Sequence, residues 1–178
     1  MAKRLLFFLL FLSVFSPLHA DQVHKEVLEN GMTVLVQEMP SSEVLSIDAY
    51  IKTGSAVEGE YSGTGISHFI EHMLFKGTAK RPVGAIAKEV GALGGTINAS
   101  TSFDYTIYTL NLPSVNFAQG LDIIADMVTN SAFDPAQVEK EREVIHGEMR
   151  LYNDRPDRRL SDLVFRNVYI RHPYRHPI

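Results

Sequence analysis

Residues 66–77 read Ile-Ser-His-Phe-Ile-Glu-His-Met-Leu-Phe-Lys-Gly. Apolar residues recur here at spacings of three and four, which predicts an amphipathic helix with one face on a core. His68, Glu71 and His72 project from this helix within about 100° of arc, since each residue turns the chain by about 100°. Two imidazoles with a carboxylate beside them suit a divalent metal ion and a bound water. This helix therefore carries a candidate metal site.

The three residues also have a simpler interpretation. A helix whose two histidines and one glutamate merely face the solvent would show the same spacing. The order His-x-x-Glu-His occurs among metallopeptidase motifs. Five positions alone leave both interpretations open.

A second helix is predicted over residues 135–152, with Asp134 as its N-cap and Pro135 in its first turn. Its apolar stripe contains two carboxylates, Glu141 and Glu148. A buried carboxylate is costly unless it is paired or bound to a cation. Glu148 could therefore complete a His-His-Glu ligand set, and Glu141 could hold a histidine through a hydrogen bond. A salt bridge to a buried arginine is the alternative. The opposite face is predicted to be solvated and carries Glu139, Glu143, His146 and Arg150.

The remaining segments alternate between strand-like and helical patterns. Strands are predicted at 23–27, 33–38, 44–52, 96–100 and 105–112, and the turn pair Asn30-Gly31 separates the first two. Helices are predicted at 82–90, 115–128 and 157–168. In 115–128 the predicted apolar face includes Phe117, Leu121 and Ile124. This order predicts the α+β class, with a mainly antiparallel sheet and helices packed on one face. No terminating element follows, so we expect a chain truncated at its C-terminus.

The composition of the chain excludes some kinds of binding partner and some kinds of metal ligand. The 178 residues carry 17 basic and 21 acidic side chains, a formal net charge of −4, with no basic run. This balance argues against nucleic acid and anionic lipid as partners. Cysteine is absent, which excludes disulfides, thiolate metal sites and a cysteine nucleophile. Any transition metal must therefore be held by histidine and carboxylate groups.

Residues 1–20 have the pattern of an export signal. Lys3 and Arg4 precede an almost wholly apolar run over residues 5–15, and Pro17 and Ala20 follow near the expected cleavage point. The run has about eleven residues and is too short to span a bilayer, which needs about 20. We therefore expect a signal peptide, an exported protein that is periplasmic or secreted, and no stable membrane span after cleavage. The mature domain would be 21–178; an uncleaved anchor is the alternative.

The sequence His-Phe-Ile-Glu-His-Met-Leu-Phe-Lys-Gly-Thr at residues 68–78 resembles the signature of the pitrilysin/insulinase family of zinc metallopeptidases. That family includes the mitochondrial processing peptidases and their bacterial relatives. Glu148 follows His72 by 76 positions, which is the spacing found in the family. The likeness runs from about residue 27 to the end, and its further blocks are 94–101, 104–106 and 141–145.

The resemblance implies Zn²⁺ as the cofactor and a role for each candidate residue. His68, His72 and Glu148 would be the zinc ligands. Glu71 would be the general base that activates a zinc-bound water, and Glu141 would be a supporting carboxylate at the catalytic site. The chain would then be the N-terminal catalytic half of a two-domain peptidase unit.

Substrate and partners are implied in the same way. The strand with Asn98 and Ala99 would lie at a sheet edge, where a substrate peptide adds as an extra strand. The implied function is a zinc-dependent endopeptidase acting on peptides or unfolded polypeptide segments, joined by a second homologous half or a partner subunit. The alternative is a non-catalytic partner subunit of the same fold that supports an active paralogue. A plain structural or carrier domain would leave the two inward glutamates unexplained.

Overall fold

The computed structural model describes residues 23–176 and 178, and the chain divides into two compact units, Met1–Ser42 and Glu43–Ile178. In the smaller unit, strands β1 (Val23–Val27) and β2 (Thr33–Gln37) pair antiparallel, as predicted. Gly31 has φ +83° in the connecting loop, a backbone conformation that favours glycine. The predicted signal at residues 1–20 lies outside the described residues. No helix in the described part of the chain has the length and apolar character needed to cross a membrane.

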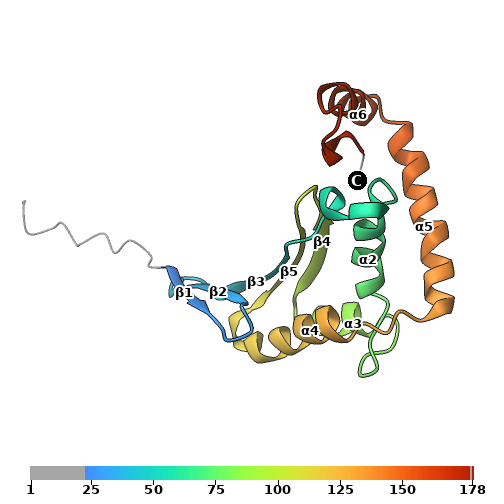
Figure 1. Cartoon of the computed structure of the whole chain (residues 1–178). Helices are drawn as coiled ribbons and strands as arrows, with labels where there is room; N and C mark the ends of the chain where they lie inside the picture. Colours follow the sequence, from blue (N-terminus) through green and yellow to red (C-terminus); the bar gives the residue numbers. More distant parts are fainter. Residues whose placement is uncertain (1–22, 177) are drawn as a thin grey trace, which may run out of the picture. The chain divides into compact units, whose positions relative to one another are not determined.

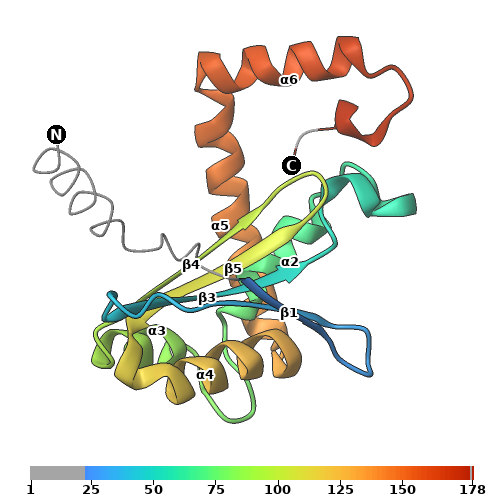
Figure 2. The ribbon, with the colours of Figure 1, turned by 90° about the vertical axis from the view of Figure 1, so that its left-hand side faces the viewer.

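The larger unit is built on a three-stranded antiparallel sheet in the order β3-β5-β4. Its strands are β3 (Val44–Ile51), β4 (Thr96–Thr101) and β5 (Thr106–Pro113). The central strand sets the register of both neighbours, because Leu110 faces Ile47 on one side and Ile97 on the other. Strand β4 therefore lies at an edge of this sheet (Figure 2).

Some helices of the larger unit cover one face of this sheet, and others pack on those helices. The helices are α2 (Ile66–Leu74), α3 (Ala85–Ala92), α4 (Phe117–Asn130), α5 (Pro135–Asn153) and α6 (Pro156–Val168). Single 3₁₀ turns occur at Ser55–Val57, Gly59–Tyr61, Ser114–Asn116 and Pro173–Arg175. Helices α2, α3 and α4 contact the sheet, whereas α5 packs against α2 and α6 (Figure 1). This confirms the predicted α+β class.

Alternate residues of β5 form the centre of the core. Tyr108, Leu110 and Leu112 are each at most 2% exposed, and they pack with Ile123 and Met127 of α4. Gly120 lets this helix approach the strand closely, because a Cβ there would lie 2.9 Å from Leu112 Cδ1. Side chains from alternate positions of β5 and from one face of α4 thus pack together in one apolar layer.

Two predicted features differ from the structure. Helix α3 begins at Ala85 and not at Pro82, because Gly84 adopts φ +83° and ends the preceding turn. In α4 the predicted apolar face was rotated from the real one, since Phe117 is 52% exposed and Leu121 is 45% exposed. The buried face of α4 consists of Gly120, Ile123, Ile124, Asp126 and Met127.

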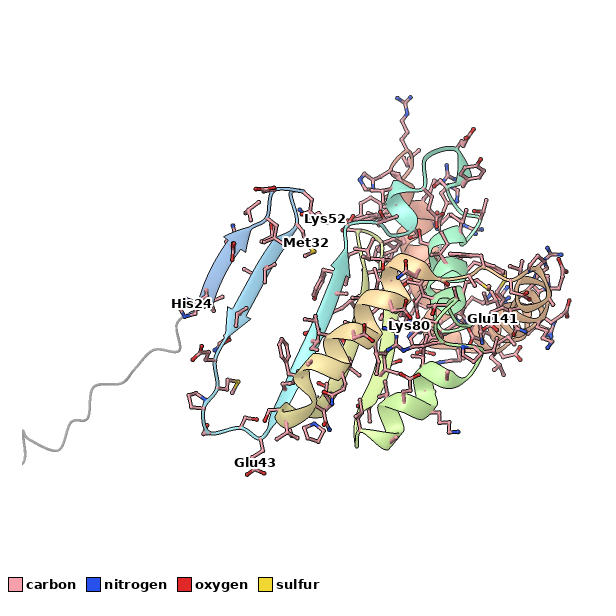
Figure 3. All side chains as sticks on the ribbon, turned by 90° about the horizontal axis from the view of Figure 1, so that it is seen from below. His24, Met32, Glu43, Lys52, Lys80 and Glu141 are labelled. Atoms are coloured by element: carbon pink, nitrogen blue, oxygen red, sulfur yellow. The ribbon has the colours of Figure 1, made fainter. Side chains whose placement is uncertain are left out.

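The polar member of that face, Asp126, is buried and forms hydrogen bonds with Arg81 and Thr78. Arg81 is only 5% exposed, and its Nη1 donates to Asp126 Oδ2 at 2.7 Å. Thr78 Oγ1 donates to the same oxygen at 2.7 Å. Burial raises the pKa of Asp126, but the hydrogen bonds from Thr78 and Arg81 outweigh it and hold that pKa below its ordinary value. Arg81 also pairs with Asp122 and Glu89. Its neighbour in sequence, Lys80, is labelled in Figure 3 beside α3 and α4.

Substituting Arg81→Met should destabilise the fold by about 3 kcal/mol, since removing one partner leaves the buried carboxylate of Asp126 without its cation. Urea unfolding at unchanged denaturant slope measures the loss. The matched control is Arg155→Met, because Arg155 forms an exposed pair with Asp157 and such pairs contribute little. Equal midpoints for the two variants would contradict the structural role given to Arg81.

Candidate metal centre

Helix α2 is held at both ends. At its start, the backbone N–H of Ser67 donates to Glu58 Oε1 at 2.9 Å, and a carboxylate at a helix N-terminus is stabilising. Met73 and Leu74 anchor the last turn, because they are 0% and 6% exposed. Gly77 follows with φ +105°, where the chain turns away. The histidines and Glu71 therefore project from a helix with a fixed position.

Helix α5 lies alongside α2 (Figure 1). Its start is as predicted: the Asp134 side chain accepts hydrogen bonds from the backbone of Ala136 and Gln137 at 2.9 and 3.1 Å. The predicted orientation is also confirmed, since Glu141 is buried and Glu148 is half-buried. The residues predicted to be solvated are all exposed, namely Glu139, Glu143, His146 and Arg150.

The two helices bring three candidate ligands together. His68 Nε2 and His72 Nε2 lie 3.1 Å apart. Glu148 Oε2 lies 3.5 Å from His72 Nε2 and 3.8 Å from His68 Nε2. Two ligand atoms that bind one zinc ion tetrahedrally, each at about 2.0–2.1 Å, are separated by about 3.3 Å. The nitrogen and oxygen donors of His68, His72 and Glu148 therefore fit a zinc ion.

Glu141 supports one of these histidines. His72 Nδ1 lies 2.8 Å from Glu141 Oε1, and residue Glu141 as a whole is 4% exposed. A carboxylate that accepts from Nδ1–H leaves the Nε2 lone pair of the same ring for a metal. The other oxygen, Oε2, pairs with Lys76 Nζ at 2.6 Å. The alternative of a salt bridge to a buried arginine is thus replaced by an ion pair with a lysine.

The groups around the site shift the pKa of Glu141 and that of His68. Burial raises the pKa of Glu141, but the hydrogen bonds from Lys76 and His72 outweigh it and lower that pKa below its ordinary value. Burial and the neighbouring His72 lower the pKa of His68. A neutral imidazole and an ionised carboxylate are the states that bind a metal.

Glu71 is held beside the ligands. It is 8% exposed, which excludes the interpretation of a solvent-facing helix. Thr101 Oγ1, at the end of β4, donates to Glu71 Oε2 at 2.5 Å. Thr106 Oγ1 lies 3.4 Å from Thr101 Oγ1 and donates to the carbonyl of Thr53 at 2.9 Å. This chain of hydroxyl groups fixes one oxygen of the Glu71 carboxylate.

A cleft of about 480 Å³ opens at the site and is lined by His68, Glu71, Ala99 and Thr101, among others. Ala99 thus lies beside the candidate metal site. Asn98 does not line the cleft; its side chain is on the exposed face of the edge strand β4.

Sequence analysis missed the contacts of Lys76 and Thr101. Lys76 follows His72 by four positions, so the helical period could have indicated that it shares a side of α2 with that histidine. No sequence signal joins Thr101 to Glu71, because their contact depends on how β4 packs against α2.

The chain is similar in sequence to known zinc proteases and processing peptidases. The family model described as Insulinase (Peptidase family M16) matches residues 33–178. The chain is 35% identical over 156 residues to an uncharacterized zinc protease of Bacillus subtilis, covering 88% of this chain and 38% of that protein. It is 34% identical over 145 residues to a probable β subunit of the mitochondrial-processing peptidase of Arabidopsis thaliana, covering 82% and 27%.

A solved structure of a protease from Helicobacter pylori has the same fold. Its TM-score is 0.81 at 30% identity, and the match covers 88% of this chain and 38% of that one. The chain therefore spans well under half the length of the relatives that it matches.

The predicted export to the periplasm or outside the cell is wrong. Several relatives are β subunits of the mitochondrial-processing peptidase, and their names point to mitochondria and away from an exported compartment. The prediction depended on composition alone, namely a basic pair followed by a short apolar run. By contrast, the family match covers most of the chain and includes every candidate ligand. The chain belongs to the insulinase family, peptidase family M16, a zinc-dependent family in which its Bacillus relative is named a zinc protease.

Proposed function

We propose that this chain forms the metal-binding half of a zinc-dependent endopeptidase that hydrolyses peptide bonds in peptides or unfolded segments. The observation that carries the proposal is the convergence of His68, His72 and Glu148, with Glu71 in the same cleft. Three protein ligands leave a fourth position for water or substrate, as catalytic zinc sites require. Relatives named as zinc protease and processing peptidase support the same class of reaction.

The proposed mechanism gives each residue one task. His68, His72 and Glu148 would hold the zinc ion, which when bound polarises the scissile carbonyl and acidifies a water. Glu71 takes a proton from the attacking water at Oε1, because Thr101 occupies Oε2. The water oxygen bonds to the carbonyl carbon, the C–N bond breaks, and Glu71 passes the proton to the leaving amine.

The proposed substrate binds in an extended conformation along β4. An edge strand offers unpaired backbone groups to which a peptide can add as a further strand. Ala99 lines the cleft, so a peptide on this edge would run past His68 and Glu71. Asn98 would contact the same peptide from the other face of the strand. A requirement for an extended backbone is the reason to propose peptides or unfolded segments as substrates.

A second homologous half or a partner subunit is proposed to complete the peptidase. The chain spans only 38% of its Bacillus relative. In addition, α5 and α6 expose large apolar side chains, including Leu151 at 68%, Leu160 at 63% and Val168 at 66%. Such residues in one region are expected where another surface covers them. The alternative of a non-catalytic subunit is less well supported, because every metal-site residue and Glu71 are present.

The first test is metal binding by the purified chain. We expect one zinc ion per chain, and the variants His72→Gln and Glu148→Gln should each weaken zinc affinity by more than about 100-fold, the upper range for merely supporting residues. Competition with a chromophoric chelator measures this affinity. His146→Gln is the matched control, because His146 is exposed on the opposite face of α5. A wild-type chain without stoichiometric zinc would overturn the proposed function.

The second test separates the general base from the ligands. In the complete peptidase, Glu71→Gln should lower kcat by about 10²–10⁴-fold, the usual contribution of a positioned proton-transfer group, while zinc content stays unchanged. Hydrolysis of a quenched fluorescent peptide reports kcat, and metal analysis reports zinc. Glu143→Gln on the exposed face of α5 should leave both unchanged. Full activity of the Glu71→Gln enzyme would exclude the role given to Glu71.

A further inference from the structure

Lys76 occupies a position that the proposed chemistry does not use. Its Nζ lies 2.6 Å from Glu141 Oε2, and the side chains of the pair are 29% and 5% exposed. Its backbone N–H donates to the carbonyl of Met73 at 2.9 Å, just beyond the end of α2. The lysine is therefore fixed at the end of the helix that carries His72, while its charge reaches a carboxylate on α5.

The two oxygens of Glu141 have different partners. Oε1 accepts from His72 Nδ1 at 2.8 Å, and Oε2 accepts from Lys76. A buried carboxylate with a neutral imidazole as its one partner would carry an uncompensated charge, which is costly. Such a carboxylate would gain by rotating toward water, which would weaken the bond to His72. The ammonium group of Lys76 compensates the charge of Glu141 in place and so removes this tendency.

We propose that Lys76 is a positioning residue for the metal site. By pairing with Glu141 it holds that carboxylate on His72 Nδ1, and so it keeps the Nε2 lone pair of His72 directed at the point shared with His68 and Glu148. This inference rests on the proposed function, since it assigns Lys76 a role toward the zinc ion that those three residues would bind. Lys76 itself touches neither metal nor substrate.

The sign of the effect distinguishes positioning from simple electrostatics. A lysine ammonium repels a divalent cation, so removal of its charge alone should strengthen zinc binding. Removal of a positioning residue should weaken zinc binding, because the hydrogen bond that orients His72 loses its support. The two explanations therefore predict opposite changes in the same measured constant.

The experiment measures zinc affinity of the full chain by chelator competition. Lys76→Met should bind zinc about tenfold more weakly than wild type, at the lower end of the range for residues that support a ligand. Lys76→Arg should recover most of the affinity, because it restores a cation with donors for Glu141 Oε2. Lys80→Met is the matched control, since Lys80 pairs with the exposed Asp122 and should leave zinc affinity unchanged.

A double-mutant cycle tests whether Lys76 acts through Glu141. In a Glu141→Gln background, the further change Lys76→Met should alter zinc affinity by less than about twofold, because coupled residues are not additive. If Lys76→Met does not fold, Lys76→Gln keeps a hydrogen-bond donor without the charge and should show the same direction of change.

The outcomes separate the two proposals. Equal or tighter zinc binding by Lys76→Met, or a tenfold loss that persists in the Glu141→Gln background, overturns the positioning role while the proposed function stands. Absence of zinc binding by the wild-type chain overturns the proposed function, and the role of Lys76 with it. Weaker binding by Lys76→Met, recovery by Lys76→Arg and no further loss in the Glu141→Gln background would together support the inference.

Discussion

The arrangement of the site depends on one buried carboxylate that joins two helices distant in sequence. Glu141 on α5 accepts from His72 on α2 and pairs with Lys76 just beyond the end of that helix. Because both contacts reach the same part of α2, they fix how α5 lies along it. Glu148 follows Glu141 by two helical turns, so the same packing directs it toward the two histidines. The cost of burying charge thus acts as a constraint on geometry, because misplacement of α5 would leave Glu141 without partners.

Much of the fold could be predicted from local patterns. The strands of the sheet, the N-cap of α5 at Asp134 and the antiparallel arrangement all followed from spacing and turn residues. The phase of α4 did not, because its buried face includes Asp126, a residue that hydropathy assigns to the solvent side. Long-range contacts with Arg81 and Thr78 make that aspartate compatible with burial. The start of α3 was predicted too early for a local reason. Pro82 is typical of the first turn of a helix, but Gly84 adopts a left-handed conformation that places the start after it.

The candidate site could be predicted where the chemistry of one residue conflicted with its position. Glu141 and Glu148 could be predicted as site residues because the two carboxylates stand on an apolar stripe, and both contact His72 of α2. Lys76 and Thr101 showed no such conflict. A lysine beyond a helix end and a threonine in a strand are ordinary, so their significance comes only from tertiary contacts with Glu141 and Glu71. The cellular location was predicted wrongly, because that prediction depended on the composition of a short terminal segment alone.

Strand β4 links Glu71, the proposed general base, to the proposed substrate edge. Thr101 holds Glu71, and Ala99 lines the cleft two residues earlier on the same face of the strand. Their positions depend on the pairing of β4 with β5, in which Ala99 faces Tyr108. A slip of one residue would turn both side chains to the opposite face of the sheet. The burial of Tyr108, which is 2% exposed, opposes such a slip. Packing in the core therefore sets the alignment between a bound peptide and the carboxylate that would take a proton from the attacking water.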